Sequence, residues 1–176
     1  MSAGRGGRTP VTVLGATGAV GQTFVRVLYG HPLLQLVKVA ASQRSTGRSY
    51  GEAARWHEGE LPDEGGALTV LPCDPVAVKS RVVFSALDAS VARPLEKTFA
   101  GAGAVVLSNA KNHRMAADIP LVIPEVNAEH FAPIETQRAN RDWSGTIVTN
   151  ANCAVTVTAL ALWPLCTASS VCVKLL

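Results

Sequence analysis

The chain has 176 residues, of which 48% are hydrophobic, 16% charged and 5% aromatic. This length predicts one compact domain with the start of a second, and the composition excludes a disordered chain, collagen and a coiled coil. The net charge of +3 is unevenly spread, because residues 1–51 hold six basic and no acidic residues. That segment lacks the basic runs and interleaved aromatic residues of nucleic-acid sites. It favours a phosphate-bearing small molecule as the ligand.

The four cysteines, at positions 73, 153, 166 and 172, form no C-x-x-C pair. No histidine lies at ligand spacing from them, so we expect no metal site. The N-terminal residues form no apolar signal segment, and we therefore expect a cytoplasmic protein with reduced thiols. Residues 143–173 carry no Lys, Arg, Asp or Glu. Polar residues and a proline interrupt this stretch, which excludes a membrane span and predicts buried protein interior.

Strands alternate with helices along the chain. A β-branched run at residues 11–14 precedes a glycine-rich turn, and an apolar helical pattern follows over residues 20–28. Residues 50–66 predict no regular element. The remaining predicted elements are a strand at 34–41 that is covered on both faces, an outer strand at 68–71, a strand at 81–87, a helix at 91–100, and strands at 104–107, 121–123 and 146–149. This alternation predicts an α/β fold with a doubly wound, mostly parallel sheet of the Rossmann type.

The turn after the first strand has glycines at a spacing of three, Gly15, Gly18 and Gly21. In a dinucleotide-binding turn the first glycine permits the tight turn, and the second lets a pyrophosphate approach the backbone. The third lets the helix pack closely on the strand. The phosphates would lie at the helix N-terminus, where free N–H groups and the helix dipole favour negative charge.

The end of the second strand indicates which dinucleotide binds. An NAD site usually places an acidic residue there for the ribose hydroxyls, but the first acidic residue of this chain is Glu52. Ser42, Arg44 and Ser45 instead supply a guanidinium and hydroxyls that suit a 2′-phosphate. This pattern favours NADP. The alternative is that Arg44 and Arg48 are ordinary solvated loop charges.

Cys153 follows the predicted strand at 146–149. If the apolar segment after it is a helix, Cys153 lies in the first turn with Asn150 or Asn152 as the cap, where the dipole favours a thiolate. Such a thiolate could attack a carbonyl and form a thioester. Two alternatives stay open, since cysteines are commonly buried and inert and the residues after Cys153 also alternate like a strand.

Five motifs in this order resemble those of aspartate-semialdehyde dehydrogenase, and the likeness is closest to its fungal and archaeal branch. They are residues 15–21 (GATGAVG), 42–45 (SQRS), 108–115 (SNAKNHRM), 120–127 (PLVIPEVN) and 150–153 (NANC). The resemblance implies NADPH-dependent reductive dephosphorylation of L-4-aspartyl phosphate to the semialdehyde, in lysine, threonine and methionine biosynthesis. It also implies that full-length members are homo-oligomers.

The resemblance assigns roles to individual residues. It makes Cys153 the nucleophile and places Arg114 and Asn109 at the substrate phosphate, where a guanidinium can bind two oxygens. The alternative for Arg114 is a surface ion pair with Asp118. The cofactor residues would be Gly15, Thr17, Gly18, Ala19, Val20, Gly21, Ser42, Arg44, Ser45, Ser85, Ala86, Leu87 and Asn152.

The chain departs from the family pattern in two ways. Ala151 replaces the proline of the usual Asn-Pro-Asn-Cys motif. The family also places a Gln, an Arg and a catalytic His beyond the nucleophile, and the four histidines of this chain all precede Cys153. We therefore expect a dinucleotide-binding domain at 1–150 and only the start of a substrate domain at 151–176, without turnover by this fragment. Residues after 165 no longer resemble the family.

The sequence leaves two other functions open. The chain could be a non-catalytic NADP-binding or interaction module, which pairs with a full-length homologue through its apolar tail. It could also be a related reductase that acts on malonyl-CoA or N-acetyl-glutamyl phosphate. In each case we expect small-molecule ligands, with neither nucleic acid nor a membrane as a partner.

Overall fold

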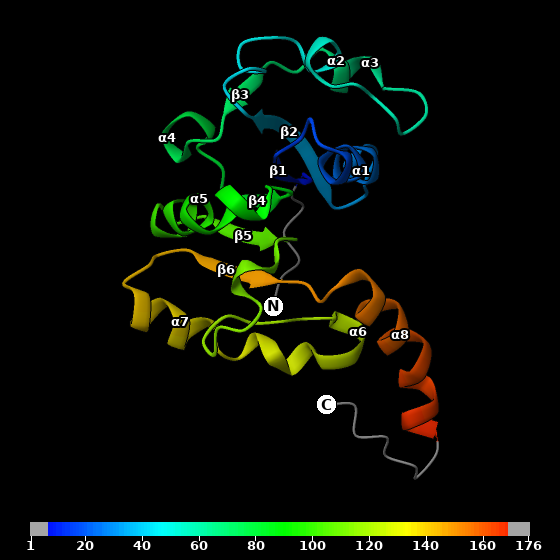
Figure 1. Cartoon of the computed structure of the whole chain (residues 1–176), viewed down its shortest axis with the longest axis vertical. Helices are drawn as coiled ribbons and strands as arrows, with labels where there is room; N and C mark the ends of the chain where they lie inside the picture. Colours follow the sequence, from blue (N-terminus) through cyan, green and yellow to red (C-terminus); the bar gives the residue numbers. More distant parts are fainter. Residues whose placement is uncertain (1–6, 169–176) are drawn as a thin grey trace.

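A computed structural model describes residues 7–168, which form a six-stranded sheet with helices on both faces (Figure 1). The strand order is β3-β2-β1-β4-β5-β6, and every neighbouring pair is parallel. The strands are β1 (Thr9–Leu14), β2 (Leu34–Ala41), β3 (Val70–Pro72), β4 (Val82–Ser85), β5 (Val105–Ser108) and β6 (Thr146–Thr149). The predicted doubly wound, Rossmann-type fold is confirmed.

Helices connect successive strands. Figure 1 shows α1 (Ala19–Leu28) on one side of the sheet, with α4 (Pro75–Val78) and α5 (Ala89–Gly101) on the other. Shorter segments fill the connections: α2 (Tyr50–Ala53), α3 (Asp63–Gly66), the 3₁₀ helices η1 (Lys111–His113) and η2 (Ala128–Phe131), α6 (Pro124–Asn127) and α7 (Ile134–Arg141). The last helix is α8 (Cys153–Ala168).

Alternate residues of the central strands point into two separate cores. Val11 and Val13 of β1 belong to the core under α1, whereas Leu14 joins Val83 and Phe99 in the core under α5. Both faces are covered, so β-branched and other apolar residues follow one another without a polar face. The prediction that the strand at 34–41 is covered on both faces is only partly correct, because in β2 only the last three residues, 39–41, are buried.

Two local predictions differ from the structure. Residues 50–66 contain the single-turn helices α2 and α3, which are too short to give a helical pattern. Residues 121–123 form no strand. Leu121 makes one bridge to Thr149, and the segment pairs with β6 only through hydrogen bonds at Pro120 and Val122 before α6 begins.

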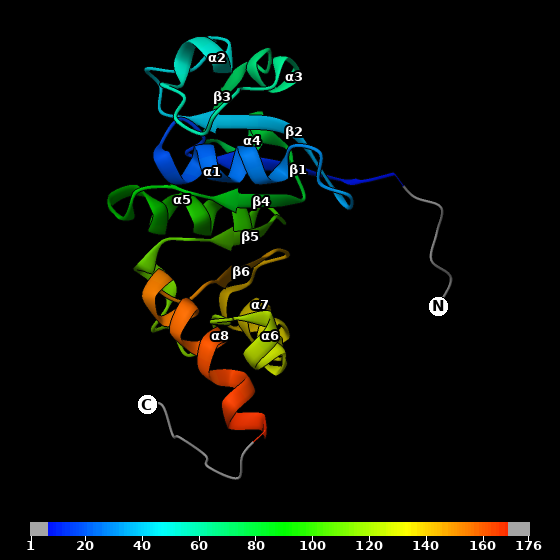
Figure 2. The ribbon, with the colours of Figure 1, turned by 90° about the vertical axis from the view of Figure 1, so that its right-hand side faces the viewer.

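The prediction of buried interior for residues 143–173 is correct for β6 and wrong for α8. All four residues of β6 are buried, but Val155 and Val157 of α8 are 56% and 68% exposed. Figure 2 shows why, since α8 extends away from the sheet. Residues 169–173 lie outside the described range. Within residues 7–168, the helices are all too short or too polar to cross a membrane.

Candidate functional site

Hydrogen bonds that continue past the strand ends bring four loops together at one edge of the sheet. The N–H of Ala86 donates to Leu14 O at 2.9 Å, and that of Asn109 to Ser85 O at 3.0 Å. The N–H of Asn150, which follows β6, donates to Ser108 O at the end of β5 and so joins the loop after β6 to the others. In open α/β sheets ligands bind outside the carboxyl ends of the strands. The predicted cofactor, phosphate and cysteine motifs therefore lie along this same edge.

The glycine turn is shaped by close backbone contacts. Gly15 has a φ of +71°, and a Cβ there would lie 2.6 Å from Ala86 O. A Cβ on Gly21 would collide with the backbone of Gly15 and Ala16. Gly18 is exposed, and the nearest atom to a Cβ there would be 3.5 Å away. The chain itself thus requires Gly15 and Gly21, while the space beside Gly18 is open to a ligand.

Two side chains that the sequence patterns did not single out fix the carbonyls of this turn. The hydroxyl of Tyr50 donates to Ala16 O at 2.8 Å, and burial raises the pKa of Tyr50. The amide of Gln22 donates to Thr17 O at 3.1 Å and to Arg55 O at 3.0 Å. Neither residue belongs to a recognisable motif, because each acts from a position whose contacts depend on the fold.

The start of α1 is suited to a diphosphate. The N–H of Gln22 makes the first helical hydrogen bond, to Gly18 O at 2.9 Å. The amides of Ala19 and Val20 precede that bond, and both residues are exposed. Free N–H groups at the start of a ten-residue helix bind negative charge. This end of α1 can hold phosphate oxygens.

The loop after β2 presents one free guanidinium. Ser42 and Ser45 close a turn, with the N–H of Ser45 donating to Ser42 O at 2.9 Å. Arg48 donates from Nη2 to Glu52 O at 2.6 Å. Arg44 is exposed, and its side chain makes no hydrogen bond or ion pair with any residue in the described part of the chain. Of the two arginines, Arg44 is the one that remains available to an anion.

The loop after β5 brings together Asn109 and Arg114. Nη2 of Arg114 donates to Asn109 O at 3.0 Å, and Nε of Arg114 is buried with no hydrogen-bond partner among residues 7–168. The alternative pairing of Arg114 with Asp118 is wrong. Asp118 instead accepts two hydrogen bonds from Arg141, at 2.5 and 2.7 Å, and they lower the pKa of Asp118.

Cys153 is the first residue of α8, as the motif predicts. Oδ1 of Asn152 accepts a hydrogen bond from the N–H of Ala154 at 2.9 Å and so caps the helix. Cys153 is exposed, and its sulfur lies 3.8 Å from the same Oδ1. The helix is confirmed over the strand alternative, and Cys153 is not a buried cysteine.

The three residues after β4 have different surroundings. Ser85 is fully buried, and its hydroxyl donates to Oε1 of Glu96 at 2.6 Å. Its side chain is therefore turned toward α5. The Ala86 carbonyl oxygen and the Leu87 nitrogen lie 2.6 and 3.2 Å from where a Cβ on Gly15 would be, and Leu87 is half-buried. The backbone of Ala86 and Leu87 therefore packs closely against the glycine turn at Gly15.

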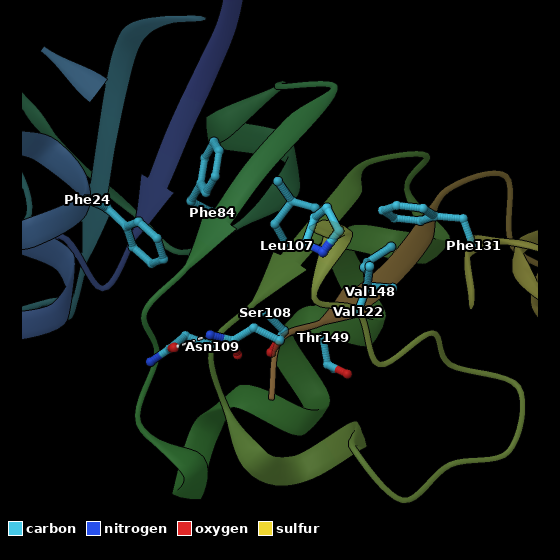
Figure 3. A pocket seen from close by; sticks show the side chains of 11 residues that line it. Phe24, Phe84, Leu107, Ser108, Asn109, Val122, Phe131, Val148 and Thr149 are labelled. Atoms are coloured by element: carbon cyan, nitrogen blue, oxygen red, sulfur yellow. Dashed lines mark hydrogen bonds between the residues drawn. The ribbon is translucent and has the colours of Figure 1, made fainter. Parts of the chain in front are cut away.

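A cavity of about 230 Å³ adjoins the strand ends (Figure 3). Phe24 and Phe84, with ring centroids 5.4 Å apart, line one end of it. Asn109 and Thr149 contribute polar groups along its lower edge in the figure. The cavity can therefore take a mainly apolar group with a polar edge. Among residues 7–168, no three His, Cys, Asp or Glu side chains are grouped to hold a metal ion.

Comparisons with known proteins agree with this geometry. Residues 10–134 match the family model described as semialdehyde dehydrogenase, NAD binding domain. The chain is 51% identical over 159 residues to an aspartate-semialdehyde dehydrogenase from Archaeoglobus fulgidus, which covers 90% of this chain and 46% of that protein. It is 40% identical over 155 residues to a malonyl CoA reductase (NADP) from Metallosphaera sedula, which covers 87% and 43%.

Among solved structures, an aspartate-semialdehyde dehydrogenase with NADP from Candida albicans matches with a TM-score of 0.83 and 39% identity. The match covers 92% of this chain and 48% of that one. The chain thus spans about half the length of the relatives that it matches.

Proposed function

The chain belongs to the semialdehyde dehydrogenase family through its NAD-binding domain, and from this premise we propose that it carries the cofactor site and nucleophile of an NADP-dependent aspartate-semialdehyde dehydrogenase. The reaction is the reductive dephosphorylation of L-4-aspartyl phosphate to L-aspartate 4-semialdehyde. One observation carries the proposal: exposed Cys153 begins α8 on the same sheet edge as the glycine turn and Arg114.

The cofactor site is supported by the open space beside Gly18 and by the free amides at the start of α1. Arg44 supports NADP over NAD, because its guanidinium is exposed next to the hydroxyls of Ser42 and Ser45. Two of the matched proteins are named with NADP. When bound, NADPH would supply the hydride.

Cys153 would act as the nucleophile. Its thiolate attacks the acyl carbon of aspartyl phosphate, the carbon–sulfur bond forms, and the carbon–oxygen bond to phosphate breaks. Arg114 and Asn109 would hold the departing phosphate, to which a guanidinium can donate two hydrogen bonds. Cys153 would hold the acyl group as a thioester while the bound cofactor reduces it; the carbon–sulfur bond would then break, which releases the aldehyde and returns the electron pair of that bond to the Cys153 sulfur.

A second candidate, malonyl-CoA reduction, is favoured by the 40% identity to the Metallosphaera sedula enzyme. That reaction also uses an acyl group and could proceed through the same cysteine. It releases a thiol rather than phosphate. The phosphate role proposed for Arg114 and Asn109 therefore favours the acyl phosphate.

We further place the reaction in the cytoplasm, with small molecules as its ligands and with residues after 150 as the start of a substrate domain. Cys73, Cys153 and Cys166 are free thiols, which suits a reducing compartment. Helix α8 extends away from the sheet and contacts α6, which suits the beginning of a separate unit (Figure 2).

Acylation of Cys153 tests the proposal without requiring complete turnover. The purified chain is incubated with L-4-aspartyl phosphate or with malonyl-CoA, and the adduct is located by peptide mass spectrometry. We expect aspartyl phosphate to acylate Cys153 and to release one phosphate per adduct, with no adduct in Cys153→Ser. Acylation by malonyl-CoA alone would favour the second candidate. Absence of both adducts, in a chain that binds NADP, would contradict the enzymatic role and favour a non-catalytic NADP-binding module.

A further inference from the structure

A buried carboxylate joins the ends of two strands below the candidate site. Glu96 of α5 is fully buried. Its Oε1 accepts hydrogen bonds from the hydroxyl of Ser85 at 2.6 Å and from that of Ser108 at 2.8 Å. Ser85 is the last residue of β4, and Ser108 is the last residue of β5. One oxygen atom therefore ties both strand ends to the helix behind them.

The second oxygen of Glu96 contacts the far end of the loop after β5. Oε2 lies 3.2 Å from Nε2 of His113, whose side chain is 2% exposed. Within the described residues neither atom has a hydrogen-bond partner, and the two atoms face each other across this 3.2 Å contact. A buried carboxylate carries a large desolvation cost that only well-placed partners offset. Replacement of buried charged groups by well-packed apolar residues is often neutral or stabilising, so stability alone is a poor reason for a glutamate here.

The proposed phosphate residues lie directly after these two attachments along the chain. Asn109 follows Ser108 directly, and Arg114 follows His113 directly. Within the loop, the N–H of Ala110 donates to the Ser108 hydroxyl at 3.2 Å. The side chain of Asn112 fastens the loop to α5 through Ala89 O at 2.8 Å. Glu96 and α5 thus contact this loop at Ser108, Asn112 and His113, next to Asn109 and Arg114.

We propose that Glu96 is a positioning residue for the phosphate site: through Ser108 and His113 it sets the place of Asn109 and of the Arg114 guanidinium. The inference rests on the proposed role of Arg114. The Arg114 Nη2 donates to Asn109 O, and its Nε has no partner within the described chain. The backbone of the loop thus aims the guanidinium. A displacement of 1 Å in such a group can cost about 100-fold in rate.

The test measures inorganic phosphate binding and the Arg114 Nε–H signal by NMR in the full 176-residue chain. The variants are Glu96→Gln, Ser108→Ala, His113→Ala and His113→Gln. We expect the first three to weaken phosphate binding by about 10-fold and to shift the Arg114 signal. His113→Gln keeps an N–H donor near Oε2 and should restore most of the affinity that His113→Ala loses.

Ser80→Ala is the matched control. Ser80 precedes β4 at the opposite end of the sheet, and its hydroxyl pairs with that of Thr12 at 2.6 Å. It should lower the unfolding temperature about as much as Ser108→Ala, but it should leave both phosphate binding and the Arg114 signal as in the wild type. If Glu96→Gln does not fold, Ser108→Ala and the two His113 variants still decide the question.

Arg114→Ala separates the two proposals. If it abolishes phosphate binding while Glu96→Gln, Ser108→Ala and His113→Ala bind phosphate like the wild type, Glu96 has no positioning role. If Arg114→Ala binds phosphate unchanged, the phosphate role of Arg114 fails. The Arg114 signal then tests Glu96 by itself, and an unchanged signal in all three variants would overturn the positioning role.

Discussion

The side-chain amide of Asn150 donates a hydrogen bond to Oδ1 of Asn109, with 2.8 Å between the two atoms. This contact joins the loop after β5 to the loop after β6, which carries Cys153. Two of the motifs identified in the sequence therefore meet through their side chains. The Asn109 oxygen is occupied by this donor, and its amide group is left for an anion.

Replacement of Asn150 tests this contact. Asn150→Asp places a carboxylate against Oδ1 of Asn109 and adds negative charge at the proposed phosphate site. We expect phosphate binding to weaken by more than about 10-fold, because like charge next to an anion site opposes binding. Asn150→Ala should weaken it less. Isothermal titration with phosphate measures both, and equal affinities in wild type and Asn150→Asp would contradict a phosphate site here.

Alanine substitution should have different effects at two glycines of the turn, lowering stability at Gly21 and NADP affinity at Gly18. Gly21→Ala forces a Cβ into the backbone of Gly15, so we expect a loss of about 1–3 kcal/mol in the free energy of unfolding. Gly18→Ala has room for its methyl group and should leave stability nearly unchanged while it weakens NADP binding. Urea unfolding and NADP titration separate the two effects. A Gly18→Ala variant as unstable as Gly21→Ala would show that Gly18 serves packing.

Tyr50 should support the glycine turn through its hydroxyl. Tyr50→Phe leaves Ala16 O without its buried donor, which we expect to cost about 1 kcal/mol in the free energy of unfolding. NADP affinity should fall several-fold, since the Ala16 carbonyl of the turn would no longer be held in place by the Tyr50 hydroxyl. Tyr29→Phe is the control, because Tyr29 is 50% exposed. Equal stability and NADP affinity in the two variants would remove Tyr50 from this role.

The Asp118–Arg141 pair should make stability depend on pH. Arg141 holds the pKa of Asp118 below its usual value, so the pair stabilises the fold above the usual aspartate pKa. That contribution is lost as the pH falls through the lowered pKa. Asp118→Asn should cost about 1–2 kcal/mol at neutral pH, and its difference from wild type should shrink below about pH 4.

Urea unfolding across this pH range measures the effect. Glu135→Gln is the control, since the Glu135 carboxylate that contacts Arg138 is 81% exposed and should contribute little at any pH. A wild type that differs from Asp118→Asn by the same amount at every pH would contradict the linkage.

The cysteines should differ in reactivity. Cys153 is exposed at the start of α8, whereas burial raises the pKa of Cys73. Iodoacetamide at neutral pH should therefore alkylate Cys153 at least about 10-fold faster than Cys73, because the thiolate is the nucleophile. Peptide mass spectrometry gives the rates. Phosphate should slow the reaction at Cys153 and leave that at Cys73 unchanged, and equal rates at both sites would argue against a nucleophilic Cys153.

Much of the fold was predictable from the sequence because its signals are local. The β-branched runs mark the strands, and the buried parallel sheet explains why these runs are apolar without alternation. The spacing of Gly15, Gly18 and Gly21 marks the turn, and the motif around Cys153 marks the start of α8. These features depend on backbone conformations that neighbouring residues impose.

Only the tertiary structure decided which side chains meet. Arg141, 23 residues from Asp118, became its partner in place of Arg114, since helix α7 lies beside that loop. The partners of Glu96 were also decided by the tertiary structure. In the sequence Glu96 is an ordinary charged residue of a helix, and only the fold brings the hydroxyls at the ends of two strands within hydrogen-bond distance of it. The exposure of α8 was likewise beyond the sequence: composition shows that a helix is apolar, but burial depends on what packs against it.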